Sequence, residues 1–385
     1  MFLSFLTKLK KIEISKFLDN NKIIFTVFTI PLELFLFVIR ISCKIFSYNS
    51  GNIVIVSLNK LGDSVFTIPA IIEIQKKYQN KIFIFCFAES VPVYKLALKN
   101  ISYCIVNHRE FYFNNRISSN KANKLLRTLK PEIVFDFSNT MTSATLLFNI
   151  RAKKIIGTNR TQFRNIYDYF IPMRNSPHLM DNYLDIIEPV VHLLDRRQIK
   201  IFPKKSSSDG IILIHPFAGW KSKEWNFTKF IKLVKILYES YDVSLIFPGN
   251  INIPKDVYEE IISDGIKCIE TIRMEDLIEN IKKCSALIGN DSGPIHIANL
   301  LGKPTFTIYG PTNPDIHIPI GSHHSYTALK INCSPIENEK VCITNAGRFG
   351  CPSFECMSQQ SWENVLLKIQ TFLKENRISN KILIN

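Results

Sequence analysis

The chain alternates short, apolar β-branched runs with amphipathic helical stretches, and it does so in two successive series. The first run, IVIVS at residues 53–57, is followed by a Gly-containing turn and a helical pattern at 65–78. Such runs are typical of strands buried on both faces, and their alternation with helices predicts a parallel, doubly wound sheet. One hydrophobic core is too small a unit for 385 residues. The sequence therefore predicts an α/β protein with two Rossmann-like domains.

The expected elements divide the chain into four parts. Further strands of the first half are expected at 81–87, 102–106, 133–137 and 154–156, with a long helix at 178–197. A polar, turn-rich linker at 203–210 precedes strands at 211–215, 243–247, 286–288 and 305–309 and helices at 228–240, 255–263, 275–283 and 294–301. The parts are a hydrophobic and basic extension (1–50), an N-terminal domain (51–203), a C-terminal domain with a cysteine-rich tail (204–360) and a terminal helix (361–385).

The N-terminal extension has the composition of a membrane-binding segment. Residues 23–39 are nearly all apolar, but a helix of this length reaches only about 25 Å against a hydrocarbon core of about 30 Å. It also carries Pro31 and Glu33 near its middle, which disfavours a simple span. An interfacial anchor, a true span and a helix packed on the protein itself stay open, and no small-residue signal-peptide site follows. Basic residues on both sides suit an anionic leaflet: Lys8, Lys10, Lys11, Lys16 and Lys22 before it, Arg40 and Lys44 after it.

The net charge of +15 favours an anionic partner, which is nucleic acid, a phosphorylated small molecule or a membrane surface. Nucleic acid is disfavoured, because the lysines are spread along the chain and no nucleic-acid-binding module occurs. A dinucleotide-dependent oxidoreductase is also disfavoured, since the turn after the first strand, SLNKLGDS, lacks G-x-G-x-x-G.

The nine cysteines fall into two groups. Five are scattered, several of them in apolar runs, and indicate buried thiols in a reducing compartment. The other four crowd near the C-terminus with the spacing C-x8-C-x8-C-x4-C, which is less regular than the C-x2-C pairs of zinc sites. Packing thiols or a local disulfide are favoured there over a structural metal. These four are Cys333, Cys342, Cys351 and Cys356.

Ligands in open parallel sheets bind beyond the carboxyl ends of the strands, so the loops after strands are the first places to look for chemistry. The loop 58–70, LNKLGDSVFTIPA, places Asp63 at or just before the first turn of a helix. There it is either an N-cap or a carboxylate base that takes a proton from an attacking hydroxyl.

The loop 215–225, HPFAGWKSKEW, also lies between a strand and a helix. Lys221 and Lys223 occupy positions suited to phosphate binding, although surface lysines are common in so basic a chain. Trp220 and Trp225 are expected to pack.

The segment 288–304, IGNDSGPIHIANLLGKP, is the most informative. Pro294 and Gly302 delimit a helix whose N-terminus faces the preceding loop. Ser292 and the free peptide N–H groups there suit a diphosphate, with His296 facing the same spot, and Asp291 is expected on sugar hydroxyls. An ordinary capped helix is the alternative. The loop 309–315, YGPTNPD, indicates only a turn.

The order LNKLGDSVFTIPAI, HPFAGWKSKEW and GNDSGPIHIANLLGKPTFTIYGPTNP resembles glycosyltransferase family 9, the ADP-heptose:lipopolysaccharide heptosyltransferases. The resemblance covers roughly residues 51–375 and includes IIGTNR, DNYLDIIEP and CPSFECMSQQSWENV. It implies a GT-B fold and an inverting, metal-independent transfer of heptose, with no cofactor, from an ADP-sugar to a lipid-linked inner-core acceptor. It also implies a cytoplasmic enzyme peripherally associated with the inner membrane surface.

The resemblance assigns roles to individual residues. Asp63 of the LGD motif would be the general base, and Lys223 of the K-x-W motif would neutralise the donor phosphates. The family often has an acidic residue where this chain has Asn250, which leaves another nucleotide-sugar, for O-antigen, capsule or other surface-glycan assembly, as the alternative. The donor loop would comprise Asp291, Ser292, Gly293 and His296, and the neighbouring donor or acceptor loops would include Gly62, Ser64, Lys221, Gly310 and Thr312.

Overall fold

The computed structural model describes residues 22–112, 117–172, 174, 178–193, 196, 210–336, 339–342, 351 and 353–381. The expected linker, apart from Gly210, and the lysines before Lys22 lie outside these residues. Contacts divide the chain into two compact units. The first comprises residues 1–58, 79–86 and 101–173, and the second comprises 59–78, 87–100 and 174–385. The four parts expected from the sequence stay a prediction.

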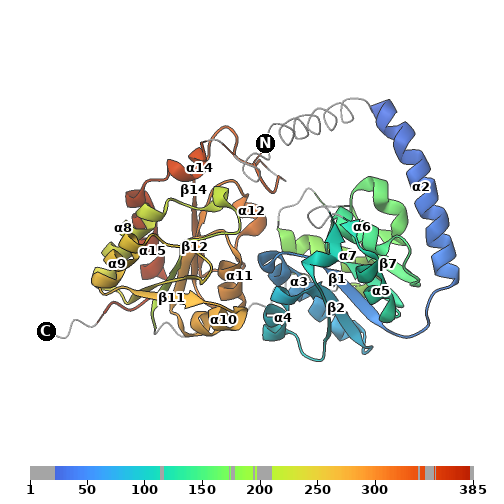
Figure 1. The fold of residues 1–385 in the computed structure, drawn as a ribbon, viewed down its shortest axis with the longest axis horizontal. Helices are drawn as coiled ribbons and strands as arrows, with labels where there is room; N and C mark the ends of the chain where they lie inside the picture. Colours follow the sequence, from blue (N-terminus) through green and yellow to red (C-terminus); the bar gives the residue numbers. More distant parts are fainter. Residues whose placement is uncertain are drawn as a thin grey trace. The chain divides into compact units, whose positions relative to one another are not determined.

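The first unit is built on a six-stranded sheet with the order β3-β2-β1-β6-β7-β8 (Figure 1). The central strand β1 runs parallel to both of its neighbours, and all five of its residues are buried. This order is that of a Rossmann fold. The strands are β1 (Ile53–Ser57), β2 (Ile82–Phe87), β3 (Ser102–Val106), β6 (Ile133–Asp136), β7 (Lys154–Gly157) and β8 (Tyr169–Phe170), and β4 (Phe111–Tyr112) pairs antiparallel with β5 (Ile117–Ser118).

Helix α2 (Lys22–Ile45) also belongs to the first unit, and Pro31 lies inside it without ending it. Leu36 and Arg40 are buried where α2 packs against the 3₁₀ helix η3 (Thr161–Ile166). Among the described helices, none combines the length and the hydropathy that crossing a bilayer requires. The remaining helices of this unit are η2 (His108–Glu110), α5 (Asn120–Thr128) and α6 (Met141–Leu147).

The second unit repeats the same topology, with the strand order β11-β10-β9-β12-β13-β14 and parallel pairing throughout. Helices α8, α9 and α15 lie on one side of this sheet, and α10 and α11 lie on the other (Figure 1). A core of apolar side chains joins the strands to α8 and α15, with Phe230 and Ile369 fully buried. The strands are β9 (Ile212–His215), β10 (Val243–Pro248), β11 (Lys267–Thr271), β12 (Ala286–Asn290), β13 (Thr305–Tyr309) and β14 (His324–Ala328).

Three α-helices and one 3₁₀ helix from the first half of the chain belong to this second unit. Helix α3 packs against both α7 and α11, which brings the loop after β1 to the N-terminus of α11. The two parallel sheets confirm the predicted α/β, GT-B-type fold. The helices of the second unit are α3 (Leu61–Lys77), η1 (Ala88–Ser90), α4 (Val91–Ala97), α7 (Leu179–Val191), η4 (Lys221–Lys223), α8 (Phe227–Ser240), α9 (Lys255–Ser263), α10 (Met274–Lys283), α11 (Gly293–Leu300), α12 (Pro314–His317), α14 (Glu355–Ser358) and α15 (Trp362–Glu375).

Candidate functional site

A buried ion pair lies at the carboxyl end of the second sheet. Nζ of Lys223, at the end of η4, is 2.5 Å from Oδ2 of Asp291, the residue that follows β12. The lysine side chain is 17% exposed and the aspartate side chain 4% exposed. The lysine side chain is therefore still partly exposed, while its counter-ion is almost fully buried.

Two further groups hold the Asp291 carboxylate. The hydroxyl of Thr312 donates to Oδ2 over 2.7 Å, and Nε2 of His296 lies 3.6 Å from Oδ1. Burial alone would raise the pKa of Asp291, but the Lys223 ammonium and the His296 hydrogen bond hold this pKa well below its usual range. Asp291 positions Lys223, and its Oδ2 is already engaged by Lys223 and Thr312 rather than free for a sugar.

The fully buried Asn290 joins the two loops that carry this pair. Its Nδ2 donates to the carbonyl of Pro216 over 2.7 Å, and its Oδ1 accepts from the N–H of Trp225 over 3.1 Å. Trp225 itself is buried and donates its indole N–H to the carbonyl of Gln360, so it packs as predicted. The loop after β9 is thus fastened to the end of β12.

The N-terminus of α11 presents polar atoms that the described residues do not satisfy. Ser292 is the N-cap residue, yet its side chain makes no capping hydrogen bond. Its buried Oγ and the buried Nδ1 of His296 have no hydrogen-bond partner among the described residues, and the same holds for Oγ of Ser222. Buried polar atoms are nearly always paired, so atoms of this kind at a helix N-terminus are suited to an anionic ligand.

Helix α3 brings the predicted base to this helix N-terminus. Lys60 is the N-cap of α3 and Asp63 lies in its first turn, so the N-cap alternative for Asp63 is wrong. A Cβ at Gly62 would lie 2.8 Å from Cδ2 of His296, and a Cβ at Gly293 would lie 2.7 Å from Cδ2 of Leu61. Both glycines are therefore needed for the first turns of α3 and α11 to approach this closely.

Two further titratable residues belong to the site and carry no recognisable motif in the sequence. His317, at the end of α12, has its pKa lowered by burial against the opposing charges of Asp291 and Asp63. Lys340 has its pKa lowered by burial too, and the Asp63 carboxylate opposes this shift. The backbone of Lys340 accepts a hydrogen bond from Asn313 N–H over 3.2 Å, which ties it to the loop after β13. Asp63 thus lies within electrostatic range of both groups.

A third lysine that the sequence did not single out flanks Trp220. The ammonium groups of Lys60 and Lys223 each lie 4.7 Å from the centroid of the Trp220 ring. An indole ring attracts cations, so it brings one further positive charge, that of Lys60, beside the Lys223–Asp291 pair. Trp220 therefore does more than pack.

The remaining predicted residues lie in other surroundings. The hydroxyl of Ser64 is buried and donates to the carbonyl of Lys60 or pairs with Ser90. Lys221 is 84% exposed and pairs with Glu224 at the surface, so of the two predicted lysines only Lys223 enters the site. A Cβ at Gly310 would lie 2.4 Å from the sulfur of Met357, which explains a glycine there.

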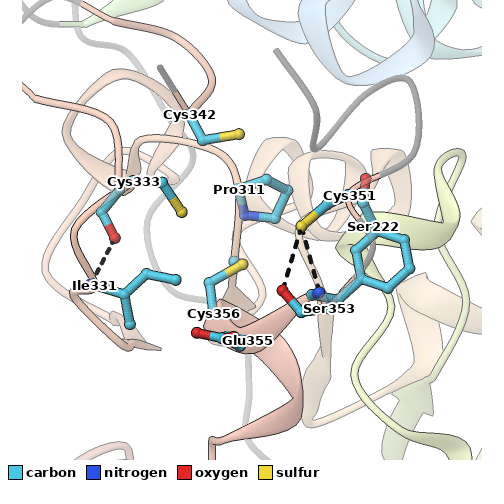
Figure 2. A pocket seen from close by; sticks show the side chains of 12 residues that line it. Ser222, Pro311, Ile331, Cys333, Cys342, Cys351, Ser353, Glu355 and Cys356 are labelled. Carbon is cyan, nitrogen blue, oxygen red and sulfur yellow. Dashed lines mark hydrogen bonds between the residues drawn. The ribbon is translucent and has the colours of Figure 1, made fainter. Parts of the chain in front are cut away.

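The four C-terminal cysteines line one small pocket in the second unit. Figure 2 shows Cys333, Cys342, Cys351 and Cys356 around Pro311. All nine cysteines of the chain lie in the described part and are free thiols, so the local disulfide is not present. The pocket of about 50 Å³ is too small for a nucleotide. Within the described residues, no group of three or more His, Cys, Asp or Glu side chains is arranged to hold a metal ion.

Two of these thiols have opposite tendencies to ionise. Backbone N–H groups of Ser353 and Phe354 direct hydrogen bonds at the Cys351 sulfur and lower the pKa of this thiol. Burial, with the neighbouring cysteines, raises the pKa of Cys356 to about 11. The cluster thus contains one activated and one inert thiol.

Known proteins match this chain along most of its length. The sequence model of glycosyltransferase family 9 (heptosyltransferase) matches residues 121–346, more than half of the chain. Lipooligosaccharide heptosyltransferase 2 of Campylobacter jejuni subsp. jejuni serotype O:2 is 22% identical over 331 residues, which cover 83% of this chain and 97% of the relative.

Solved structures share the fold. ADP-heptose LPS heptosyltransferase II of E. coli aligns with a TM-score of 0.61 and 17% identity, over 85% of this chain and 99% of its own. E. coli heptosyltransferase WaaC with ADP aligns with a TM-score of 0.56 and 13% identity, also over 85% of this chain and 99% of its own. At these identities the likeness establishes the fold of two Rossmann-like domains.

Proposed function

The chain belongs to glycosyltransferase family 9, and from this premise we propose that it transfers a heptose from ADP-heptose to a sugar of the lipopolysaccharide inner core. The solved relatives include one described with ADP, and the curated relative is named for lipooligosaccharide. The single observation that carries the proposal is the pairing of Lys223 with Asp291 at the N-terminus of α11. This arrangement fixes a cation where a helix N-terminus already attracts an anion.

The donor diphosphate would bind to the free face of Lys223 and to the first peptide N–H groups of α11. The unsatisfied Oγ of Ser292 and Nδ1 of His296 would complete its hydrogen bonds. Negative charge grows on the diphosphate as the sugar departs, so groups fixed in advance stabilise the transition state more than the bound donor. Asp291 serves here as a positioning residue, because it contacts Lys223 and His296 rather than the donor.

Asp63 would act as the general base. It lies in the first turn of α3, and α3 packs against α11, the helix that would bind the donor. Lys340 and His317 are half-buried within range of its charge, and they would orient the carboxylate toward the acceptor hydroxyl.

The reaction is a single displacement in this proposal. The acceptor oxygen forms a bond to the anomeric carbon while the bond from that carbon to the diphosphate breaks, which inverts the configuration. The acceptor proton passes to Asp63, and ADP leaves with the electron pair.

The positive charge of Lys223 and of the α11 N-terminus takes the role that a divalent ion has in other transferases. Full activity in excess EDTA is the expected result, and its loss would remove metal independence from the proposal.

The acceptor in this proposal is anchored in lipid, which places the enzyme at the cytoplasmic surface of the inner membrane. The alternative is a family 9 transferase for O-antigen, capsule or another surface glycan, using another nucleotide-sugar. It is favoured by the exposed Asn250 after β10, where the family often has an acid. Against it, Oε2 of Glu270 lies 3.9 Å from the position that a Cβ at Gly249 would take, so an acid still lies beside this loop.

Calorimetry on the purified protein separates these alternatives. ADP should bind more tightly than UDP or GDP, and the opposite order would favour the alternative donor.

Asp63→Asn should retain ADP binding but lose transfer, because it removes the base and leaves the donor site intact. Lys223→Ala should weaken both by at least about tenfold. Incubation with ADP-heptose and truncated lipopolysaccharides, followed by mass spectrometry, identifies the acceptor; unchanged ADP affinity in Lys223→Ala would contradict the donor site.

A further inference from the structure

Helix α2 lies at the surface, yet its exposed side chains are mostly apolar and charged side chains lie on the side that faces the protein. The positions that face the protein are Leu36 and Arg40, which are buried, and Glu33, Ile39 and Cys43, which are half-buried; they recur at helical spacing and include two charged side chains. Between residues 30 and 46, most of the exposed side chains are apolar. Those at least 44% exposed are Ile30, Leu34, Phe35, Phe37, Val38, Ile41, Ile45 and the adjoining Phe46; these eight residues are the outer face.

Polar contacts fix which side of α2 faces the folded unit. Arg40 donates to the carboxylate of Asp168 and, over 2.8 Å, to the carbonyl of Ala152. Lys44 also bonds to Asp168, over 2.9 Å. At the other end, Glu33 pairs with Arg164 over 3.1 Å. Turning the outer face inward would strip the buried Arg40 guanidinium of its partners, which is costly, so the apolar side chains stay exposed.

Eight exposed apolar side chains on one helix and its end require a partner, since scattered single residues are the normal case for a soluble surface. The charges around the outer face indicate which partner. Within residues 30–46 and 160–168, the anionic side chains are Glu33 and Asp168, and both are paired. The cationic side chains in these two segments are Arg40, Lys44, Arg160 and Arg164, and Arg151 adds a further cation over the Phe46 ring, 5.8 Å from its centroid.

We infer that the outer face of α2 inserts into the interfacial region of an anionic phospholipid bilayer, with the helix axis parallel to the membrane. The contacts of Glu33 and Arg40 keep one long side of the helix on the folded unit, and this fits a helix that lies flat. The excess of cationic side chains complements anionic headgroups. A second copy of the chain would instead bring two cationic rims together. The inference rests on the proposed function, in which the enzyme acts at a membrane surface. It adds that α2 is the element that binds the membrane and that anionic phospholipid is the lipid it binds.

Vesicle sedimentation with the full chain tests this inference without using the transfer reaction. Wild-type protein should sediment with vesicles containing about 30 mol % phosphatidylglycerol, and less with pure phosphatidylcholine or at high salt. The combined variant Phe35→Gln, Val38→Gln, Ile41→Gln keeps good helix formers at exposed positions and should lower the partition coefficient at least about tenfold. The matched control is Ile272→Gln with Leu367→Gln, which removes exposed apolar side chains from the second unit and should sediment like wild type.

Two results would overturn the inference. One is wild-type protein that stays in solution with both kinds of vesicle, and the other is a triple variant that sediments as wild type does. A lipid-free dimer that the triple variant abolishes, together with no vesicle binding, would assign the outer face to a second copy instead. Transfer to a lipid-free acceptor reports on the proposed function separately, because the triple variant should retain it.

Discussion

The ammonium of Lys223 and the carboxylate of Asp291 form an ion pair 2.5 Å long, in which neither side chain is more than 17% exposed. Partners removed from water in this way depend on each other, because a buried charge left alone keeps its desolvation cost and loses its compensation. The Lys223–Asp291 pair is therefore part of the site, and removing one partner alone should destabilise the folded protein.

Lys223→Met should destabilise the protein by about 3 kcal/mol, because it leaves the Asp291 carboxylate buried with no ammonium. The double variant Lys223→Met, Asp291→Asn should recover most of this loss. The matched control is Lys221→Met, whose side chain is 84% exposed and whose loss should cost no more than about 1 kcal/mol. Urea denaturation of the four proteins measures these differences. Equal losses in the two lysine variants would mean that the Lys223–Asp291 pair is not effectively buried.

The close approach of α3 and α11 gives a second prediction. Gly62→Ala should displace the His296 ring, because the new methyl group would lie 2.8 Å from its Cδ2. His296 contacts Asp291, so transfer should fall at least about tenfold and the Tm should drop by a few degrees. Gly219→Ala is the control, since a Cβ there meets no atom within 4 Å. Activity assays with thermal melts compare the two, and wild-type behaviour of Gly62→Ala would refute the contact.

The strands of the fold differ in how well the sequence predicts them. β1, β3 and β13 begin and end as expected, because each is a largely apolar run bounded by polar or turn residues. The edge strands β11 and β14 were missed. Their sequences, KCIET and HSYTA, leave most residues partly exposed, so no apolar run marks them. These two segments become strands because they pair with β10 and β13, and the local sequence does not show this pairing.

The candidate site was predictable where a loop follows a strand and contains a recognisable motif. This holds for Asp63, Lys223 and His296. His317 and Lys340 reach the site through a short helix and a distant loop, and no local pattern distinguishes them from other basic residues. The partner of Asp291 was not predictable either, since Lys223 is 68 positions away in the sequence and only the tertiary fold brings the two together.

A buried acid in the first unit predicts a pH effect on stability. Burial raises the pKa of Asp136 to about 6, although the Tyr167 hydroxyl donates to Oδ2 over 2.7 Å and the Ser138 N–H to Oδ1 over 2.9 Å. The folded pKa thus exceeds the unfolded value of about 4, so the folded state binds more protons between these values. Stability from this carboxyl is present below about pH 4 and is lost as the pH rises through about 6.

Asp136→Asn removes this titration and supplies the comparison. The stability difference between wild type and this variant should shift against wild type by up to about 3 kcal/mol between pH 4 and pH 7. The stability of wild type alone would not isolate Asp136, because a buried histidine changes stability with pH in the opposite direction. Burial lowers the pKa of His215 to about 4, so its contribution to the stability of the folded state rises with pH. Denaturant unfolding at each pH provides the measurement. A constant difference across this range would show that Asp136 ionises in the folded state as it does in the unfolded one.

The cysteine pocket gives a prediction about reactivity. The thiolate is the nucleophile, so Cys351, with its lowered pKa, should react with iodoacetamide at neutral pH before Cys356 and Cys268 do. These three side chains are all partly exposed, and burial raises the pKa of Cys356 and Cys268 to about 11. Access alone would therefore give similar rates, whereas ionisation should separate them by at least about tenfold. Peptide mass spectrometry over a time course measures the order, and Cys356 reacting first would show that the N–H groups of Ser353 and Phe354 do not stabilise a thiolate at Cys351.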